Sequence, residues 1–276
     1  MAKTTAAPSA VGVVLGGDNR VRVLNTTVPP AGWVGQIESS WPDGSTTLGT
    51  GTLLDDHVVL TCAHNFYNTK KKIYASAAVF KPGLNRSAIG TLQQPYGAYA
   101  LQSWSVPILY VKTGGPPPPP AGVAWSDVTN YLYDYAVGKL GKAISDPPGS
   151  SMLDVNWPGD AAIPGLACAI NGYSGDLDPT ASTQYTRPGN VALSNGDDFL
   201  MYTMSTYHGD SGAPIYYQPA GKNYWYIIGV HVTGVPDSYP GANDGRNFGP
   251  AMTGDALQWV QNVRYGVTQL KAIQPR

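Results

Sequence analysis

The sequence has few charged residues, few cysteines and no long apolar run. Only 13% of its 276 residues are charged, and the formal net charge is −1. The chain therefore has no basic stripe that could neutralise phosphates, and we expect no nucleic-acid partner. No stretch reaches the roughly 18 apolar residues that a membrane helix needs, so we expect no membrane partner either.

Patterns that bind metals or form disulfides are also scarce. The two cysteines allow at most one disulfide, and their spacing matches no metal motif. We favour separate buried thiols at Cys62 and Cys168 over a disulfide between them. No D-x-D-x-D-G calcium loop occurs. We expect no metal site and no cofactor, and the sequence leaves calcium binding open.

Glycine, proline and tyrosine are abundant, with 33, 24 and 18 copies. Short β-type runs broken by turn residues are typical of sandwiches and barrels. A helix is predicted near the end, where Thr253 can cap an apolar stripe of Ala256, Leu257, Val260 and Val263. The predicted strands cover residues 34–40, 47–54, 58–62, 72–80, 135–140, 166–172, 184–193, 200–204, 214–217 and 225–232.

A proline-rich segment separates the two halves of the chain. The five prolines at 116–120 favour an extended path without N–H donors. We interpret this run as a stiff surface loop, and a partner-binding motif is the alternative. The segment from about 83 to 128 is expected to decorate the first barrel or the connection between barrels. The predicted division is an N-terminal tail or propeptide remnant at 1–13, a first β-barrel at 14–125 that includes the proline-rich 112–125 loop, and a second barrel with the terminal helix at 126–276.

The segment at 208–214, with sequence HGDSGAP, carries the clearest chemical signal. A serine between glycines suits a strained turn that presents Ser211 as a nucleophile. The backbone N–H groups of Gly209 and Ser211 are expected to point at one oxygen, as an oxyanion hole requires. A plain small-residue loop is the alternative interpretation.

Acyl transfer by serine also needs a base and an acid that orients the base. His64 follows an apolar run and is the candidate base, although a satisfied core histidine is the alternative. Asp134 lies among three tyrosines at the start of a β run, where a buried carboxylate needs a partner. That partner is an imidazole N–H or local backbone amides. The order His64, Asp134, Ser211 is that of chymotrypsin-like enzymes rather than subtilisins or α/β-hydrolases.

Three blocks of the sequence resemble chymotrypsin-like serine proteases. TCAH at 61–64 is similar to their T-A-A-H block, DYAV at 134–137 to their D-hydrophobic-A-hydrophobic block, and GDSGAP at 209–214 to G-D-S-G-G-P. Further stretches resemble bacterial glutamyl endopeptidases: VLGGDNR with VLNTT near the N-terminus, NGYSGD at 171–176 and IGVH at 228–231. The resemblance implies an all-β fold of two six-stranded antiparallel barrels with a C-terminal helix and a cleft between the barrels.

The resemblance also implies an activity, serine endopeptidase cleavage after Glu, with Asp second, through an acyl-enzyme on Ser211. His231 would line the specificity pocket and hold the glutamate side chain, together with Thr206, and His208 would sit at the pocket rim. Three alternatives stay open. They are a chymotrypsin-like protease of other specificity whose pocket His208 closes, a protease-shaped binding module without activity, and an esterase that uses the same site.

The same resemblance places a free N-terminal amine near this pocket, at Val13 or Val14, after removal of the preceding residues. Asp210 pairs either with that amine or with local amides. His57 matches no role and is expected on the surface. We expect a secreted monomer that acts on proteins or peptides, with its signal segment outside this sequence.

Overall fold

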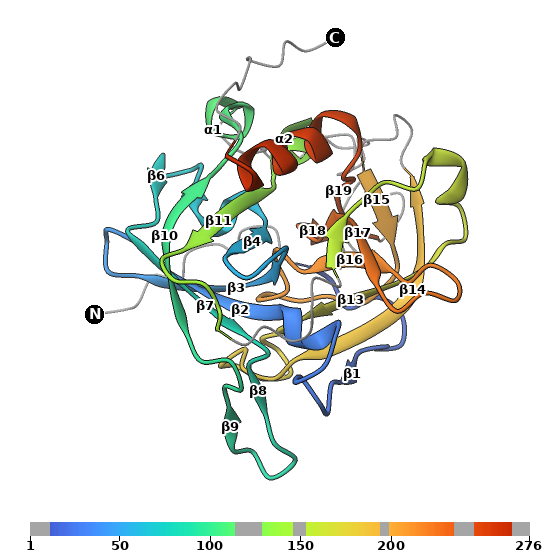
Figure 1. Ribbon diagram of the computed structural model, residues 1–276, viewed down its shortest axis with the longest axis horizontal. Coiled ribbons are helices and arrows are strands. Elements are labelled where there is room, and N and C mark those ends of the chain that lie inside the picture. The colour runs from blue at the N-terminus through green and yellow to red at the C-terminus, as the bar shows by residue number, and fades with distance from the viewer. Residues whose placement is uncertain (1–11, 114–128, 146–152, 194–198, 235–245, 267–276) are drawn as a thin grey trace.

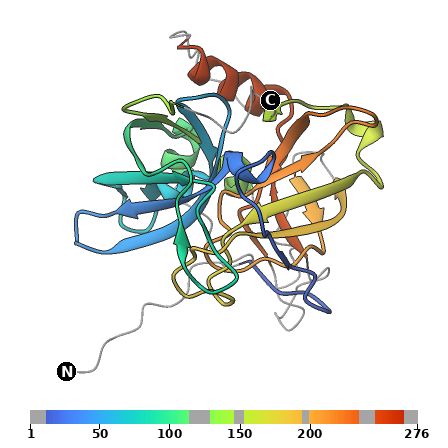
Figure 2. The same ribbon diagram turned by 60° about the horizontal axis from the view of Figure 1, so that its bottom comes forward.

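The protein is described by a computed structural model over residues 12–113, 129–145, 153–193, 199–234 and 246–266. Two β units lie side by side, and the C-terminal helix α2 (Gly254–Arg264) lies across them (Figures 1 and 2). The proline run and the proposed boundary at 125/126 lie outside the described residues. None of the described helices is long and apolar enough to cross a membrane.

The first unit is a closed six-stranded barrel in which all neighbouring strands are antiparallel. Ile37, Phe66 and Phe80 fill its interior with side chains that are fully buried. Around the barrel the order is β10 (Tyr99–Ser105), β11 (Ala136–Leu140), β4 (Val58–Thr61), β3 (Thr46–Leu53), β2 (Val34–Ser40) and β7 (Ala77–Pro82).

The second unit is a nine-stranded sheet that curls back on itself. Gly229 in strand 225–230 forms an antiparallel bridge with Ala251, which directly follows strand 247–250, and the Met252 N–H donates to the Ile228 carbonyl at 2.8 Å. A Cβ on Gly249 would lie 1.7 Å from the Val230 oxygen, so this close approach requires glycine. The sheet order is β12 (Leu153–Val155), β17 (Trp225–Val230), β16 (Pro214–Tyr217), β13 (Ala167–Gly172), β14 (Tyr185–Leu193), β15 (Phe199–Tyr202), β19 (Asn247–Pro250) and β18 (Thr233–Gly234), with β1 (Val21–Arg22) paired to β14.

The predicted all-β class with a terminal helix is confirmed. The second unit is a nine-stranded sheet rather than a six-stranded antiparallel barrel, because β1, β12 and β18 extend it and β12 pairs parallel to β17; its curl is closed by one bridge. The remaining elements are short. They are the hairpins β5 (Tyr67–Asn68) with β6 (Ile73–Tyr74) and β8 (Asn85–Arg86) with β9 (Leu92–Gln93), helix α1 (Ile108–Thr113), and the 3-10 turns η1 (Ala31–Trp33), η2 (Ala63–Asn65), η4 (Thr129–Tyr133) and η5 (Asp160–Ala162).

The expectation for residues 83–128 was wrong in one respect. Strand β10 belongs to this segment and is one of the six strands that close the first barrel, not a decoration of it. Only Leu101 of β10 is buried, so the strand lacks the alternating apolar pattern by which a sequence reveals a β-strand. The predicted strand at 72–80 is in fact two strands, β6 and β7.

Helix α2 connects the two units. Trp259 and Val260 are buried, and the Trp259 ring packs edge-on against Tyr135 at 5.3 Å between centroids. Arg264 pairs with Asp55 of the first unit at 3.1 Å and with Asp154 of the second at 2.7 Å. Thr253 occupies the N-cap position as predicted, but its side chain forms no capping hydrogen bond.

Candidate active site

The candidate base is held by its acid through two hydrogen bonds. His64 lies in η2, directly after strand β4, and Asp134 lies between η4 and β11. One carboxylate oxygen of Asp134 accepts the His64 backbone N–H at 2.9 Å, and the other lies 2.8 Å from Nδ1 of the ring. Asp134 is 1% exposed, whereas 33% of the His64 side chain remains exposed. The ring is therefore fixed on one side and accessible on the other.

This arrangement favours the charged form of the imidazole. Burial disfavours a charge on His64, but the adjacent Asp134 carboxylate and the Cys62 sulfur together outweigh burial and raise the pKa of His64 well above 6.5. A proton on Nδ1 directed at Asp134 leaves Nε2 as the basic nitrogen.

Ser211 lies in a turn that requires glycine at two positions, 209 before the serine and 212 after it. Gly209 and Gly212 have φ values of +99° and +90°. A Cβ on Gly209 would lie 2.3 Å from the Tyr173 carbonyl oxygen, and one on Gly212 would lie 2.2 Å from the Thr50 carbonyl oxygen. These contacts are with backbone, which cannot move aside as a flexible side chain would.

The first β unit anchors this turn of the second. The Thr50 N–H donates to the Ser211 carbonyl at 2.8 Å, and the Thr50 hydroxyl donates to the Gly209 carbonyl at 2.8 Å. The Asn65 amide, next to His64 in the chain, also donates to the Ser211 carbonyl at 3.1 Å. The predicted base and nucleophile are therefore brought to the same place, between the two units.

With both carbonyls anchored, the backbone N–H groups of Gly209 and Ser211 form no hydrogen bond with any described residue. Two free donors beside a nucleophile are what an oxyanion hole requires. Within the described parts of the chain, the Ser211 hydroxyl has no hydrogen bond to His64. The Nε2 atom of His64 instead lies 3.4 Å from the sulfur of Cys62. Hydrogen bonds between catalytic groups are often incomplete without substrate.

Asp210, the residue before Ser211, has a partner that neither sequence alternative included. Its carboxylate lies 2.7 Å from the guanidinium of Arg187 on β14, and both side chains are fully buried. The ion pair is close in distance but lies outside the angular range of a hydrogen bond. Asp210 also accepts the Ser174 hydroxyl at 2.6 Å and the Tyr207 N–H at 2.9 Å. The turn is thus braced by an internal cation and one local amide.

The predicted specificity residues His231 and Thr206 are both fully buried. The Tyr202 hydroxyl lies 2.6 Å from Nδ1 of His231, while Nε2 of His231 and the hydroxyl of Thr206 have no partner among the described residues. Burial, followed by the positive charges of Arg187 and His64, lowers the pKa of His231 well below 6.5. The ring is therefore neutral near pH 7. A proton donated by Tyr202 to Nδ1 leaves the ring proton on Nε2.

The N-terminal segment covers these two unpartnered atoms. A Cβ on Gly12 would lie 2.2 Å from the Thr206 hydroxyl oxygen and 2.9 Å from Nε2 of His231. The next residue, Val13, is held by its backbone, since its N–H donates to Asn247 at 2.8 Å and its carbonyl accepts from Asn247 at 2.7 Å and from the Thr206 N–H at 3.1 Å.

The other two histidines are exposed. The side chain of His208 forms no hydrogen bond with a described residue. Although the residue is exposed, partial loss of hydration, followed by the charge of His64, lowers the pKa of its ring. His57 lies on the surface beside Asp55 and Asp56, as expected. Both cysteines are buried and unpaired, as favoured from the sequence.

Sequence reasoning missed several residues of the site. Arg187 gave a signal, because it is the single charged residue in the β run 184–193. Asn65 and Thr50 gave none, since their partners are backbone carbonyls more than a hundred residues away along the chain.

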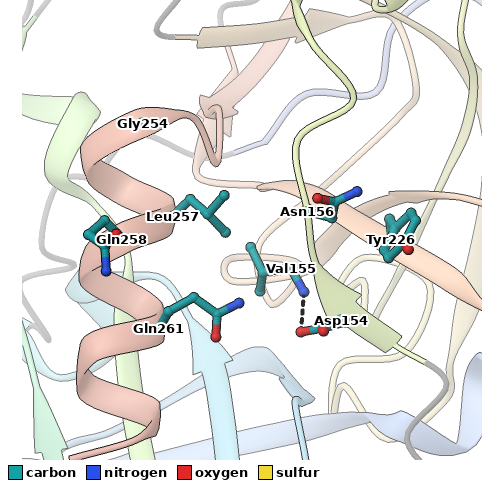
Figure 3. A pocket seen from close by; sticks show the side chains of 8 residues that line it. All are labelled: Asp154, Val155, Asn156, Tyr226, Gly254, Leu257, Gln258 and Gln261. Carbon is teal, nitrogen blue, oxygen red and sulfur yellow. Dashed lines mark hydrogen bonds between the residues drawn. The ribbon is translucent and has the colours of Figure 1, made fainter. Parts of the chain in front are cut away.

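Two described groups have three side chains close enough to share a metal ion: Cys62 with His64 and Asp134, and Asp55 with Asp56 and His57. A separate cavity of about 410 Å³ lies where Leu257 and Gln261 of α2 reach toward Asp154 and Val155 (Figure 3). None of the predicted site residues lines it. Its lining consists of Asp154, Val155, Asn156, Tyr226, Gly254, Leu257, Gln258 and Gln261.

Comparison with known proteins gives two relatives in sequence, although no protein-family model matches the chain. Glutamyl endopeptidase of Bacillus licheniformis is 30% identical over 232 residues, which cover 83% of this chain and 63% of that protein. The chain thus spans less than two thirds of that relative. Extracellular metalloprotease of Bacillus subtilis is 28% identical over 267 residues, which cover 93% of this chain and 70% of that protein.

The fold gives a consistent result. A solved structure of Glu endopeptidase in complex with MPD matches with a TM-score of 0.70 and 26% identity, over 92% of this chain and 100% of that chain. The fold is thus shared over nearly the whole length of the chain. The chain has a chymotrypsin-like fold, and it is similar to glutamyl endopeptidases in both sequence and structure.

Proposed function

We propose that the protein is a secreted serine endopeptidase that cleaves peptide bonds after Glu, with Asp second. The observation that carries the proposal is the meeting of the His64–Asp134 pair with the braced turn of Ser211, beside two unused backbone donors. The names of the two relatives support it, since one is a glutamyl endopeptidase and the other is called extracellular.

In the proposed mechanism Ser211 attacks the carbonyl carbon of the scissile bond while Nε2 of His64 takes the hydroxyl proton. Asp134 holds the ring orientation and stabilises the imidazolium. The N–H groups of Gly209 and Ser211 bind the oxyanion. His64 then gives its proton to the leaving amine, and water, activated in the same way, hydrolyses the acyl-enzyme.

We further propose that the substrate carboxylate binds between Nε2 of His231 and the Thr206 hydroxyl. A carboxylate that loses water needs replacement donors, and these two groups have no other partner. His208, exposed near the turn, is proposed for the pocket rim. Because Gly12 covers both donors, the pocket opens only when the residues before Val13 leave. A start at Val13 keeps all three of its backbone hydrogen bonds, so we favour it over Val14.

The test combines a substrate panel with an active-site probe. Peptide p-nitroanilides ending in Glu, Asp, Gln, Lys, Phe or Leu should be cleaved best after Glu, and preference for Lys or Phe would overturn the pocket assignment. Ser211→Ala should reduce turnover by about four to six orders of magnitude with unchanged circular dichroism. An organophosphonate should label the wild type at Ser211, and failure to label would favour a binding module without activity.

A metal-dependent peptidase is the second candidate, because Cys62, His64 and Asp134 lie close enough to share an ion. Both oxygens of Asp134 are already used by His64, so only two free donors remain, whereas catalytic zinc usually has three protein ligands. Dialysis against EDTA should therefore leave peptidase activity intact, and loss of activity that Zn²⁺ restores would favour this candidate.

A further inference from the structure

The proposed mechanism makes no use of Cys62. This residue is fully buried directly after strand β4, two positions before His64, and its sulfur lies 3.4 Å from Nε2 of the ring. Nε2 is the nitrogen that would take the Ser211 proton. A thiol and the basic imidazole nitrogen therefore face each other beside the nucleophile.

The spacing of these two atoms suits a tetrahedral metal ion. Zinc binds thiolate sulfur at about 2.3 Å and imidazole nitrogen at about 2.0–2.1 Å, which places the two ligand atoms about 3.5 Å apart at a tetrahedral angle. The observed 3.4 Å needs almost no movement of either side chain.

The surroundings of His64 provide the outer half of such a site. Histidines that bind metals commonly donate their second ring N–H to a carboxylate, which fixes the tautomer and ring orientation. Asp134 occupies that position, 2.8 Å from Nδ1. The exposed 33% of the His64 side chain leaves a route for the ion and for water as its remaining ligands.

We propose that Cys62 and His64 form a binding site for one thiophilic divalent cation of the zinc class, and that its occupation switches the peptidase off. On binding, the Cys62 thiol gives its proton to solvent and forms a metal–sulfur bond. The His64 imidazolium gives its Nε2 proton to solvent and binds the ion through the freed lone pair, and two waters leave the ion. No redox step occurs. With the lone pair occupied, His64 cannot take the Ser211 proton.

Binding can be tested independently of activity, and only the inhibition rests on the proposed function. In a titration, the Ser211→Ala protein should bind one equivalent of Co²⁺ per chain and should develop a near-ultraviolet thiolate-to-cobalt absorption band. Adding Cys62→Ala should remove the band and weaken Zn²⁺ binding measured by calorimetry at least 100-fold. Cys168→Ala, at the second buried thiol, and His57→Gln, at the exposed Asp55–Asp56 cluster, should change neither.

The activity arm uses the otherwise wild-type protein. Zn²⁺ should inhibit cleavage, and Cys62→Ala should be inhibited only at concentrations at least 100-fold higher. Equal inhibition of both proteins, absence of the cobalt band, or activation by Zn²⁺ would each overturn the proposal. If the protein cleaves no substrate, the band still decides the binding site, so the failure of the proposed function and that of the metal site remain distinguishable.

Discussion

The strongest stability prediction concerns the ion pair behind the nucleophile. Changing Arg187→Met removes the cation and leaves the Asp210 carboxylate fully buried, with only the Ser174 hydroxyl and the Tyr207 N–H as donors. Breaking a buried ion pair from one side costs about 3–5 kcal/mol, because the remaining charge is uncompensated. For a chain of this size we expect the melting temperature to fall by about 10 °C.

The assay is thermal unfolding followed by circular dichroism in the Ser211→Ala background, which prevents self-digestion. Lys81→Met is the matched control, since it removes a cation from the partly exposed pair with Glu38 and should cost less than about 1 kcal/mol. The double variant Arg187→Met with Asp210→Asn should recover part of the loss, because no buried charge remains. A double variant as unstable as the sum of the two single variants would refute the reasoning.

The same variant reports on the turn. Asp210 fixes Tyr207 and Ser174 around the strained glycines, so its displacement shifts the two oxyanion donors. A misplacement of about 1 Å costs about 100-fold in turnover. Arg187→Met in the otherwise wild-type protein should therefore lower kcat about 100-fold with a small change in KM. An unchanged kcat would show that the ion pair does not position the oxyanion donors.

Three further variants test other parts of the structure. Asp134→Asn should lower kcat about 10⁴-fold, and because the carboxylate raises the pKa of its histidine partner, the acidic limb of the pH–rate profile should move to lower pH; a limb that stays in place would argue against this cause. Gly212→Ala places a Cβ 2.2 Å from the Thr50 carbonyl oxygen at φ +90°, so thermal unfolding should show a loss of more than about 3 kcal/mol. The control Gly221→Ala, at φ +71° with no atom within 4 Å, should cost about 1 kcal/mol, and equal losses would contradict the steric argument. Hydroxyl and amide donors outweigh burial and hold the pKa of Asp178 below 3.8, so its contribution is complete above that pH and is lost as the pH falls. Asp178→Asn should therefore flatten the decline of unfolding free energy below about pH 4 in urea titrations.

The local sequence was sufficient where function or fold depends on neighbouring residues. Strands 34–40 and 214–217 were predicted at their observed bounds, because their apolar residues and flanking turns are adjacent in the chain. The turn around Ser211 could also be identified, since the glycines that it requires lie next to it.

The sequence was insufficient where a contact joins distant segments. Strand β10 closes the first barrel with a single buried residue, which leaves no periodic signal. The pairing of Asp210 with Arg187 depends on how β14 packs behind the turn. The position of Gly12 over His231 and Thr206 depends on the hydrogen bonds between Asn247 and Val13, and no property of Gly12 itself indicates it.

Because Thr50 and Asn65 anchor the turn around Ser211, the proposed active site can form only after both halves of the chain have been synthesised. The serine lies in the half made last, and the groups that fix its carbonyl lie in the half made first. In a chain whose two halves have folded but have not yet packed together, the turn around Ser211 lacks its anchoring hydrogen bonds, and His64 does not lie beside Ser211. Under the proposed function, such an intermediate has no peptidase activity. Packing of the two halves is therefore a requirement for the proposed activity that comes before any removal of the N-terminal residues.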